Sequence, residues 1–325
     1  TQTQPNEDRP APETLVVTAH RLPTSTPTPP VSIRNLDGRP DIGTDAFRDL
    51  PSFAISQAGS LGSLTQVRVR GAEANHLLVL LDGVEIMDPT TDAGFNFANL
   101  NLAGIHHLEF LPGAHSAIWG SDAVAGVLQL SSRPVDRVRR LEVESGSFDT
   151  RYARAQFADA QDGYYYNVSL ADFTTDGTNI ARTGSEADGH DNWGGFLSAG
   201  VDRDGWGLRA LMRRARTESD FDPTPFPAFL PEDGDRQNRH DEQLALLGLD
   251  IGGGARNWEE HLTLSYFEAE NRTVAEGQRT ASSRGERWKI TSVTRWAPHP
   301  RHHLDLLLEH EEERFVQKGQ ASFFG

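Results

Sequence analysis

The side chains best suited to chemistry in this sequence are carboxylates in a polar stretch between residues 216 and 241. Carboxylate oxygens are the hard ligands that calcium prefers, and a calcium site takes roughly six to eight oxygens. We therefore regard the stretch as a candidate calcium site, with these candidate ligands: Asp220, Asp222, Asp233, Asp235 and Asp241. Because their spacing follows no strict ligand pattern, a solvated acidic loop is the alternative interpretation.

The residue patterns of covalent catalysis are missing from the sequence. Its 12 histidines form no H-E-x-x-H pair, and no serine stands in a G-x-S-x-G turn. The adjacent pairs His106-His107 and His302-His303 are poor metal sites, because neighbouring residues of a strand point to opposite faces. Cysteine is absent, which excludes a thiolate zinc site, a cysteine nucleophile and a disulfide framework. We therefore expect no enzymatic activity.

The bulk composition narrows the class of protein further. The net charge of −16 argues against nucleic-acid binding through a basic surface. The longest apolar run, Leu77 to Leu81, is far shorter than the roughly 20 residues of a membrane-spanning helix. A mean hydropathy of −0.53 still permits a membrane β-barrel, whose strands show lipid only every second side chain.

Residues 1–40 predict a flexible, extended segment, because they are rich in proline and polar residues. A short β-prone island interrupts it: Glu13, Thr14, Leu15, Val16, Val17, Thr18 and Ala19. Such an island can add as a strand to the sheet edge of another protein, although it could also be the first strand of the next domain. Residues 1–12 do not resemble a signal peptide, so we expect a mature chain from which the signal has been removed.

Residues 41–134 predict a compact α/β unit. Strands are expected at 66–71, 76–81, 107–111 and 127–130, with a hairpin turn at Asp82-Gly83 and a short helix or turn at 116–119.

From residue 135 the pattern changes to that of a partial transmembrane β-barrel. Eight segments each carry one apolar face at period two, at about 153–157, 164–170, 195–201, 206–212, 245–251, 262–266, 288–296 and 304–308. Polar or small residues such as Asn167, Ser198 and Arg213 occupy the alternate positions. Tight turns at 162–163, 204–205, 252–254 and 298–300 alternate with long polar loops at 174–192, 216–241 and 269–286. A soluble antiparallel sandwich is the alternative, but it gives no reason for this alternation of loop lengths.

Geometry indicates that these strands are only part of a barrel. An eight-stranded barrel is filled by its own side chains, whereas a barrel that holds a plugging domain has about 22 strands. The fold class we expect is therefore an α/β plug domain followed by the first ~8 antiparallel strands of a transmembrane β-barrel. The remaining strands would come from further C-terminal sequence or from a second chain.

The motifs of the α/β unit resemble those of the TonB-dependent outer-membrane receptors. They are Val67 to Gly71, Leu78 to Val84, Leu108 to Phe110 and Ser116 to Val127, and their order and spacing are specific. Two departures are Pro112-Gly113-Ala114, where the family usually has Arg-Gly-Pro, and Ala125-Gly126, where it has Gly-Gly. The resemblance implies a bacterial outer-membrane location and identifies residues 13–19 as the TonB box, which pairs with the energy-coupling protein TonB.

The resemblance also implies residue roles and a ligand class. Arg70 and Glu109 match the residues that lock plug to barrel. Ligand contacts are expected from the plug apex, at Ser60, Leu61, Gly62, Ser63, Leu64, Thr90, Thr91, Asp92 and Asn96. Residues 58–83 and 116–127 are most similar to the cobalamin transporters, which use calcium to order their outer loops. Cobalamin or another corrinoid is therefore the expected ligand. A ferric-siderophore receptor is the first alternative, and a passive channel or structural barrel is the alternative from another class.

Overall fold

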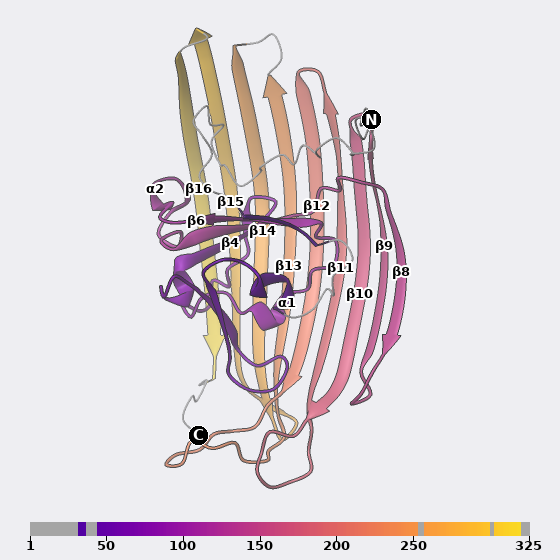
Figure 1. Cartoon of the computed structure of the whole chain (residues 1–325). Helices are drawn as coiled ribbons and strands as arrows, with labels where there is room; N and C mark the ends of the chain where they lie inside the picture. The colour runs from indigo at the N-terminus through magenta and orange to yellow at the C-terminus, as the bar shows by residue number, and fades with distance from the viewer. Residues whose placement is uncertain (1–31, 37–43, 253–256, 300–301, 320–325) are drawn as a thin grey trace, which may run out of the picture.

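The structure, a computed structural model, describes residues 32–36, 44–252, 257–299 and 302–319 (Figure 1). The expected TonB box at 13–19 lies outside the described residues. The described chain has two parts. A small α/β unit between residues 32 and 134, which we call the plug, lies against a large antiparallel sheet, which we call the wall.

The plug is made of short strands and single helical turns. In chain order they are β1 (Ser32–Asn35), α1 (Asp45–Arg48), β2 (Phe53–Gln57), β3 (Thr65–Val69), η1 (Ala74–His76), β4 (Leu77–Leu81), β5 (Val84–Glu85), η2 (Phe97–Asn99), β6 (His107–Pro112), α2 (Ser116–Trp119) and β7 (Gly126–Ser131). The strands expected from the sequence in this region are therefore present. Asp82 and Gly83 both have positive φ, 47° and 84°, and make the expected two-residue turn.

The plug's main sheet has the strand order β1-β6-β7-β4-β5. β4 runs parallel to β7, and the other neighbours are antiparallel. Every residue of β4 is buried, as an uninterrupted apolar run predicts for a strand covered on both faces. Phe47, Phe97 and Phe110 are among the largest fully buried side chains, and they fill the core between this sheet and the β2-β3 hairpin.

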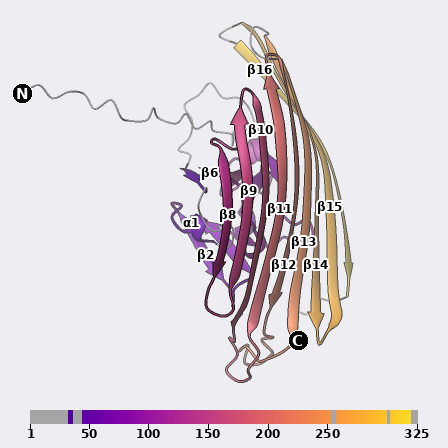
Figure 2. The ribbon, with the colours of Figure 1, turned by 90° about the vertical axis from the view of Figure 1, so that its right-hand side faces the viewer.

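The wall is a nine-stranded sheet in which each strand pairs antiparallel with its sequence neighbour. Its strands are β8 (Val138–Ser145), β9 (Arg151–Gln161), β10 (Tyr164–Thr178), β11 (Asp188–Arg203), β12 (Trp206–Asp220), β13 (Arg236–Gly252), β14 (Trp258–Ala275), β15 (Gln278–His299) and β16 (His302–Lys318). The sheet bows around the plug, which lies on its concave side (Figures 1 and 2). It is an open sheet, with β8 and β16 at its edges.

The wall has one strand more than the eight that the sequence predicts. The additional strand is β8, whose apolar face consists of little more than Leu141 and Val143, 76% and 85% exposed. Charged residues surround these two, so the alternation is too short to stand out in the sequence. The whole length of β8 nevertheless pairs with β9.

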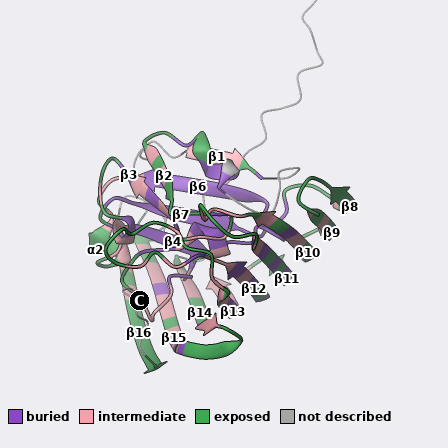
Figure 3. Cartoon of the chain, turned by 90° about the horizontal axis from the view of Figure 1, so that it is seen from below, coloured by how far each residue is buried: buried purple, intermediate pink, exposed green. Residues whose placement is uncertain are grey.

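Alternate residues of each wall strand face the plug and the opposite side. In β10, Asn167 and Ser169 are buried on the plug side, whereas Val168 and Leu170 are 40% and 51% exposed on the other. Figure 3 shows buried residues concentrated in the plug and exposed residues along β16 and the β8 edge. A polar inner face and an exposed apolar outer face are what the period-two pattern predicts for a barrel wall.

The connections at one end of the wall differ from the expected loops. The first two long loops are present but shorter, at 179–187 and 221–235. The prediction of a long loop at 269–286 is wrong, because β14 and β15 continue through this range. They are joined by a two-residue turn at Glu276-Gly277, in which both residues have positive φ. Polar side chains on both faces make these strand ends look like loops in the sequence, but cross-strand ion pairs such as Arg284–Glu268 line them.

Among the described residues, no helix has the length and apolar character needed to cross a membrane.

Candidate functional site at the plug and the outer loops

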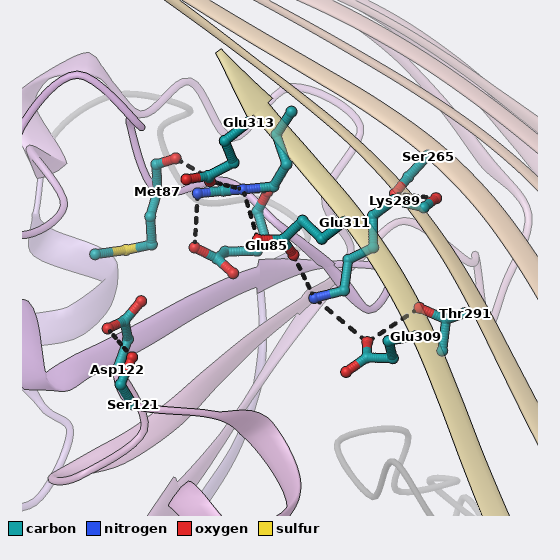
Figure 4. Close-up of polar contacts among 11 residues, drawn as sticks. Glu85, Met87, Ser121, Asp122, Ser265, Lys289, Thr291, Glu309, Glu311 and Glu313 are labelled. Carbon is teal, nitrogen blue, oxygen red and sulfur yellow. Dashed lines mark hydrogen bonds and ion pairs between the residues drawn. The ribbon is translucent and has the colours of Figure 1, made fainter. Parts of the chain in front are cut away.

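A cluster of charged side chains joins the plug to β15 and β16 (Figure 4). Arg287 of β15 is 6% exposed, and its Nη2 lies 3.0 Å from Oε1 of Glu85 in β5. Its Nη1 also donates to the carbonyl oxygen of Met87 at 3.3 Å. Glu313 of β16 forms a second ion pair with the same guanidinium. One wall arginine thus holds a plug carboxylate and a plug carbonyl at once.

A second cation extends this cluster along the inner face of the wall. Lys289, two residues from Arg287, has its Nζ 2.8 Å from Glu311 and 3.3 Å from Glu309. Carboxylates outnumber cations here. Burial raises the pKa of Glu85, with Arg287 and Lys289 opposing the rise and the charge of Glu311 adding to it.

Further along the wall, inner-face polar side chains bind backbone carbonyls of the plug. Asn167 Nδ2 donates to the carbonyl oxygens of Gly104 and Ser132, at 2.7 and 2.9 Å. Arg213 Nη2 donates to the carbonyl oxygen of Asn101 at 3.1 Å, and the same arginine pairs with Glu242 inside the sheet. These contacts satisfy polar groups that the interface would otherwise leave buried and unpaired.

Residue identity alone does not reveal these plug-to-wall contacts. Asn167 and Arg213 stand at the polar positions of the period-two pattern, so the sequence predicts that they point inward. It does not predict which plug atom each one meets, because a single sequence carries no information about the pairing of distant segments.

The two loops expected to contact ligand lie next to the wall ends that carry the long loops. Loop 58–64 approaches β11 and β12: a Cβ built on Gly62 would lie 2.2 Å from both His190 Nδ1 and Ser219 Oγ. Loop 88–96 is bound to β14 and β15, since Asn271 Nδ2 donates to Asp88 Oδ2 at 2.6 Å and Ser283 pairs with Thr90 at 3.2 Å. The structure thus brings both loops to the same end of the molecule.

The predicted ligand-contact residues differ in how much surface they offer. Leu61, Leu64, Thr91 and Asp92 are exposed, and Gly62, Ser63 and Thr90 are half-buried. Ser60 is buried, and its hydroxyl is 3.4 Å from that of Ser63. The Oδ1 of Asn96 accepts from the backbone N–H of Thr65 and of Ala98, so this side chain caps η2 and anchors the loop.

The two residues expected to lock plug to barrel lie in different surroundings. Arg70 is exposed at the end of the β2-β3 hairpin with φ 53°, and its backbone N–H donates to Ser52. Glu109 is completely buried in β6, with Oε1 3.4 Å from Nε2 of His107 in the same strand. A locking role for either residue stays a prediction, while the plug-to-wall contacts described above come from other residues.

The outer acidic residues are only partly brought together. Asp222 and Asp233 of loop 221–235 meet Glu186 of loop 179–187, and one carboxylate oxygen from each lies within 4.8 Å of the others. Asp222 is 8% exposed, and its Oδ2 has no hydrogen-bond partner among the described residues. Partial burial, followed by the charges of Asp222 and its neighbours, raises the pKa of Glu186. Glu186 is absent from the predicted ligands because it precedes Asp220, the first of them, by 34 positions.

The other three predicted metal ligands have different partners. Asp220 accepts a hydrogen bond from Gln237 at 3.0 Å, and Asp235 is exposed with its carbonyl bound to the N–H of Glu276. Asp241 lies in β13 rather than in a loop, and its Oδ2 is 3.6 Å from Arg272. The expected loop at 216–241 is too long at both ends, which is why Asp241 was grouped with the others.

Comparisons with known proteins agree with this architecture. A family model described as TonB-dependent Receptor Plug Domain matches residues 37–127. The solved structure of the copper transporter OprC matches 89% of this chain and 47% of its own, at 14% identity and a TM-score of 0.65. The siderophore receptor PiuA from Acinetobacter baumannii gives the same identity and TM-score over 89% and 46%. The siderophore receptor PirA from Pseudomonas aeruginosa matches over 91% and 50%, at 17% identity and a TM-score of 0.60.

These likenesses define the fold of both parts of the chain. The chain spans about half the length of the solved structures that it matches. TonB-dependent receptors are transport receptors of the bacterial outer membrane, not enzymes. Residues 37–127 therefore match the TonB-dependent receptor plug domain, and the strands that follow have the fold of the corresponding part of these solved structures.

Proposed function

We propose that this chain is the plug and first barrel section of an outer-membrane receptor that imports a large, scarce ligand with energy supplied through TonB. The observation that carries the proposal is a matched plug domain held on the inner face of the wall, with loops 58–64 and 88–96 at the long-loop end. A ligand bound there would contact plug and outer loops together. The segment Glu13–Ala19 would then pair with TonB as an added strand.

Deletion of residues 13–19 tests the energy coupling. Ligand binding to whole cells should be unchanged, because the deleted segment lies far along the chain from the apex loops. Uptake should stop, because TonB would have no strand to pair with. Uptake that continues at the wild-type rate after the deletion contradicts the proposal. A matched control deletes seven residues of the same linker, 24–30, and should leave uptake intact.

Two observations support different classes of transported ligand. Sequence similarity at residues 58–83 and 116–127 favours cobalamin or another corrinoid. The solved structures with the same fold include receptors for siderophores and a transporter for copper, which favours a ferric chelate at least as well. Competition binding of cyanocobalamin and a panel of ferric siderophores to the complete receptor separates the two, since only the true ligand should bind below the micromolar range.

We also propose that calcium orders the outer loops through Glu186, Asp222 and Asp233. Three carboxylates from two loops converge, and the buried Asp222 Oδ2 lacks a partner among the described residues. A bound calcium ion would supply that partner and join loop 179–187 to loop 221–235. Calcium titration monitored by protection of these loops from protease tests the site.

A passive channel is the rival from a different class. The plug lies across the inner face of the wall and is bound to it at several points along its width. A barrel closed around this plug should conduct few ions. Conductance of the purified receptor in planar bilayers should therefore be low, and a large, steady conductance would favour the channel.

A further inference from the structure

The outer face of the wall carries aromatic side chains at two levels. Trp258 and Trp296 are directly paired near the tight turns, and Tyr266 and Trp288 are paired nearer the long loops. Eight residues of β14 separate the two levels, which corresponds to ~27 Å along the strand at 3.4 Å per residue and to roughly 20 Å of height at a strand tilt of about 35–45°. An outer-membrane barrel has an apolar band ~25 Å tall between its aromatic girdles. The level of Tyr266 therefore marks the leaflet on the long-loop side.

Just beyond this outer level, the same face is rich in arginines that have carboxylate partners. The following arginines each lie within 3.5 Å of a carboxylate oxygen: Arg216, Arg239, Arg272, Arg284 and Arg314. Arg214 of β12 lies in the same band, two residues beyond Met212 on the same face, and is exposed. In the part of the chain that the structure describes, it has neither an ion pair nor a side-chain hydrogen bond.

A groove of about 410 Å³ lies beside Arg214 on this outer face. Its floor is apolar and is formed by outward side chains of adjacent strands: Leu170, Leu197, Met212, Ala245 and Tyr266. Gly195 and Ala245 create the depression, because each stands between larger neighbours on the flanking strands. Gln243, paired with Arg214 across the β12-β13 ladder, lines the same edge, and its side chain is hydrogen-bonded to Glu268 of β14.

The chemistry of this groove matches a lipid that carries phosphate. The apolar floor suits an acyl chain, because it continues the exposed leucines of the outer face. A guanidinium binds phosphate through two parallel N–H donors, and an arginine that is not already neutralised by a carboxylate is free to do so.

We propose that the groove between Gly195, Arg214 and Ala245 binds one molecule of lipid A from the outer leaflet. An acyl chain lies on the floor, and a lipid phosphate is held by the Arg214 guanidinium. The proposal rests on the wall being part of an outer-membrane barrel, as proposed above, but not on the identity of the transported ligand or on TonB.

Native mass spectrometry of the complete, delipidated receptor tests the proposal, with bisphosphorylated lipid A, dephosphorylated lipid A and phosphatidylglycerol as separate probes. One lipid A should remain bound in the wild type. Arg214→Gln should bind it about tenfold more weakly, as expected for losing one charge-assisted contact. Ala245→Leu, which adds side-chain volume to the groove floor, should weaken all acyl-chain probes and leave the arginine in place.

Arg216→Gln is the matched control. It removes an outward arginine two residues away that is already paired with Glu218, so its lipid A affinity should stay within about twofold of wild type. Equal binding by wild type and Arg214→Gln overturns the proposal. So does an equal loss in Arg216→Gln, or a preference for phosphatidylglycerol or dephosphorylated lipid A.

The two proposals fail in different ways. Arg214→Gln should still take up ligand, and the receptor lacking residues 13–19 should still retain lipid A. Uptake without lipid A binding therefore contradicts only the groove, and lipid A binding without any uptake by the wild type contradicts only the transport function.

Discussion

Arg287 and Glu85 are 202 residues apart in the sequence, yet Arg287 Nη2 lies 3.0 Å from Glu85 Oε1 where the wall meets the plug. The arginine is nearly inaccessible and also binds the Met87 carbonyl oxygen, so its removal would leave the Glu85 carboxylate and the Met87 carbonyl oxygen of the plug without this donor. This ion pair therefore holds the plug directly against the wall.

Arg287→Met should loosen the plug without unfolding the wall. Removing one partner of a buried ion pair costs about 3 kcal/mol, because the remaining carboxylates lose their counter-charge. Because this chain has no cysteine, a fluorophore attached through Ser121→Cys on the plug surface can report plug release during urea titration. The midpoint for release should fall, while the wall signal in circular dichroism stays unchanged.

Glu85→Gln is the control for this prediction and tests the sign of the electrostatics. Burial raises the pKa of Glu85 above 4.5, so the folded protein holds this proton more tightly than the unfolded chain. The contribution of the protonated Glu85 carboxyl to folding stability is therefore fully present below pH 4.5 and is lost as pH rises through the raised pKa. The amide should remove that pH dependence and cost less than about 1.5 kcal/mol, since its oxygen still accepts from Arg287. A larger loss than that of Arg287→Met would contradict the assignment.

Gly62→Ala should displace the apex loop 58–64. Gly62 has φ +87°, and an added Cβ would lie 2.2 Å from His190 and Ser219, so the loop must move away from the wall. Gly71→Ala is a matched control, because its φ of +78° brings the same backbone strain with no atom within 4 Å of the added carbon. Backbone strain should lower the stability of both variants by about 1 kcal/mol. Overpacking should lower the stability of Gly62→Ala alone by a further 1–3 kcal/mol or so.

Ligand affinity of the complete receptor, measured by calorimetry, separates the two glycine variants. Gly62→Ala should bind its ligand several-fold more weakly, while Gly71→Ala binds like the wild type. If the affinities of the two variants are the same, loop 58–64 does not contribute to the ligand site.

The sequence predicts the strands of this protein better than it predicts where they end and which segments they contact. Leu262, Leu264 and Tyr266 reveal a strand because apolar residues alternate with polar ones over its membrane-sized middle. The same rule misses the end of that strand, where both faces are polar, and so misplaces the turn at Glu276-Gly277. The turn has its own signal, a dipeptide ending in glycine between two β-prone runs, which a search for two-residue hairpins could have found.

In the candidate sites, the sequence identifies residues that are close along the chain but not those that the fold brings together. The acidic stretch identifies Asp222 and Asp233 as close in sequence, and the fold keeps them together. Glu186 belongs to another loop, and only the pairing of β11 with β12 brings that loop alongside. Arg287 and Glu85 could not be matched from residue types, because the strand that faces a given plug segment depends on how far the wall bows around it.

Asp222→Asn should abolish calcium-dependent ordering of the outer loops. It removes the charge of the buried member of the cluster, whereas Asp235→Asn, the matched control, alters an exposed aspartate outside the cluster. Loop protection from protease with increasing calcium should disappear in the first variant and persist in the second. Calcium protection that survives Asp222→Asn would place the ion elsewhere.

The same site should respond to pH in a defined direction. The pKa of Glu186 is raised, so this carboxyl keeps its proton at a pH where an ordinary glutamate has lost it. Calcium binds only the deprotonated form, so affinity should rise with pH and level off above the raised pKa. Glu186→Gln should weaken calcium binding and flatten this dependence.

Leu247→Arg tests whether the outer face of the wall contacts lipid. Leu247 is 51% exposed and lies between the two aromatic levels, paired with Leu264 of the next strand. In a soluble sheet an arginine at so exposed a position would cost little. At the middle of a bilayer it costs about 2–4 kcal/mol, falling to about 0–1 near the interfaces.

Val274→Arg provides the comparison, because Val274 is on the same face of β14 as Leu264 but near the outer tip of the strand. Folding of the complete receptor into phosphatidylcholine vesicles, followed by urea titration, should show a larger penalty for Leu247→Arg than for Val274→Arg, because Leu264 lies inside the level of Tyr266 and Val274 lies well outside it. Equal and small penalties would mean that the exposed leucines face water or another protein. In that case the alternating pattern would describe a sandwich, and the apolar face would need a partner sheet rather than a membrane.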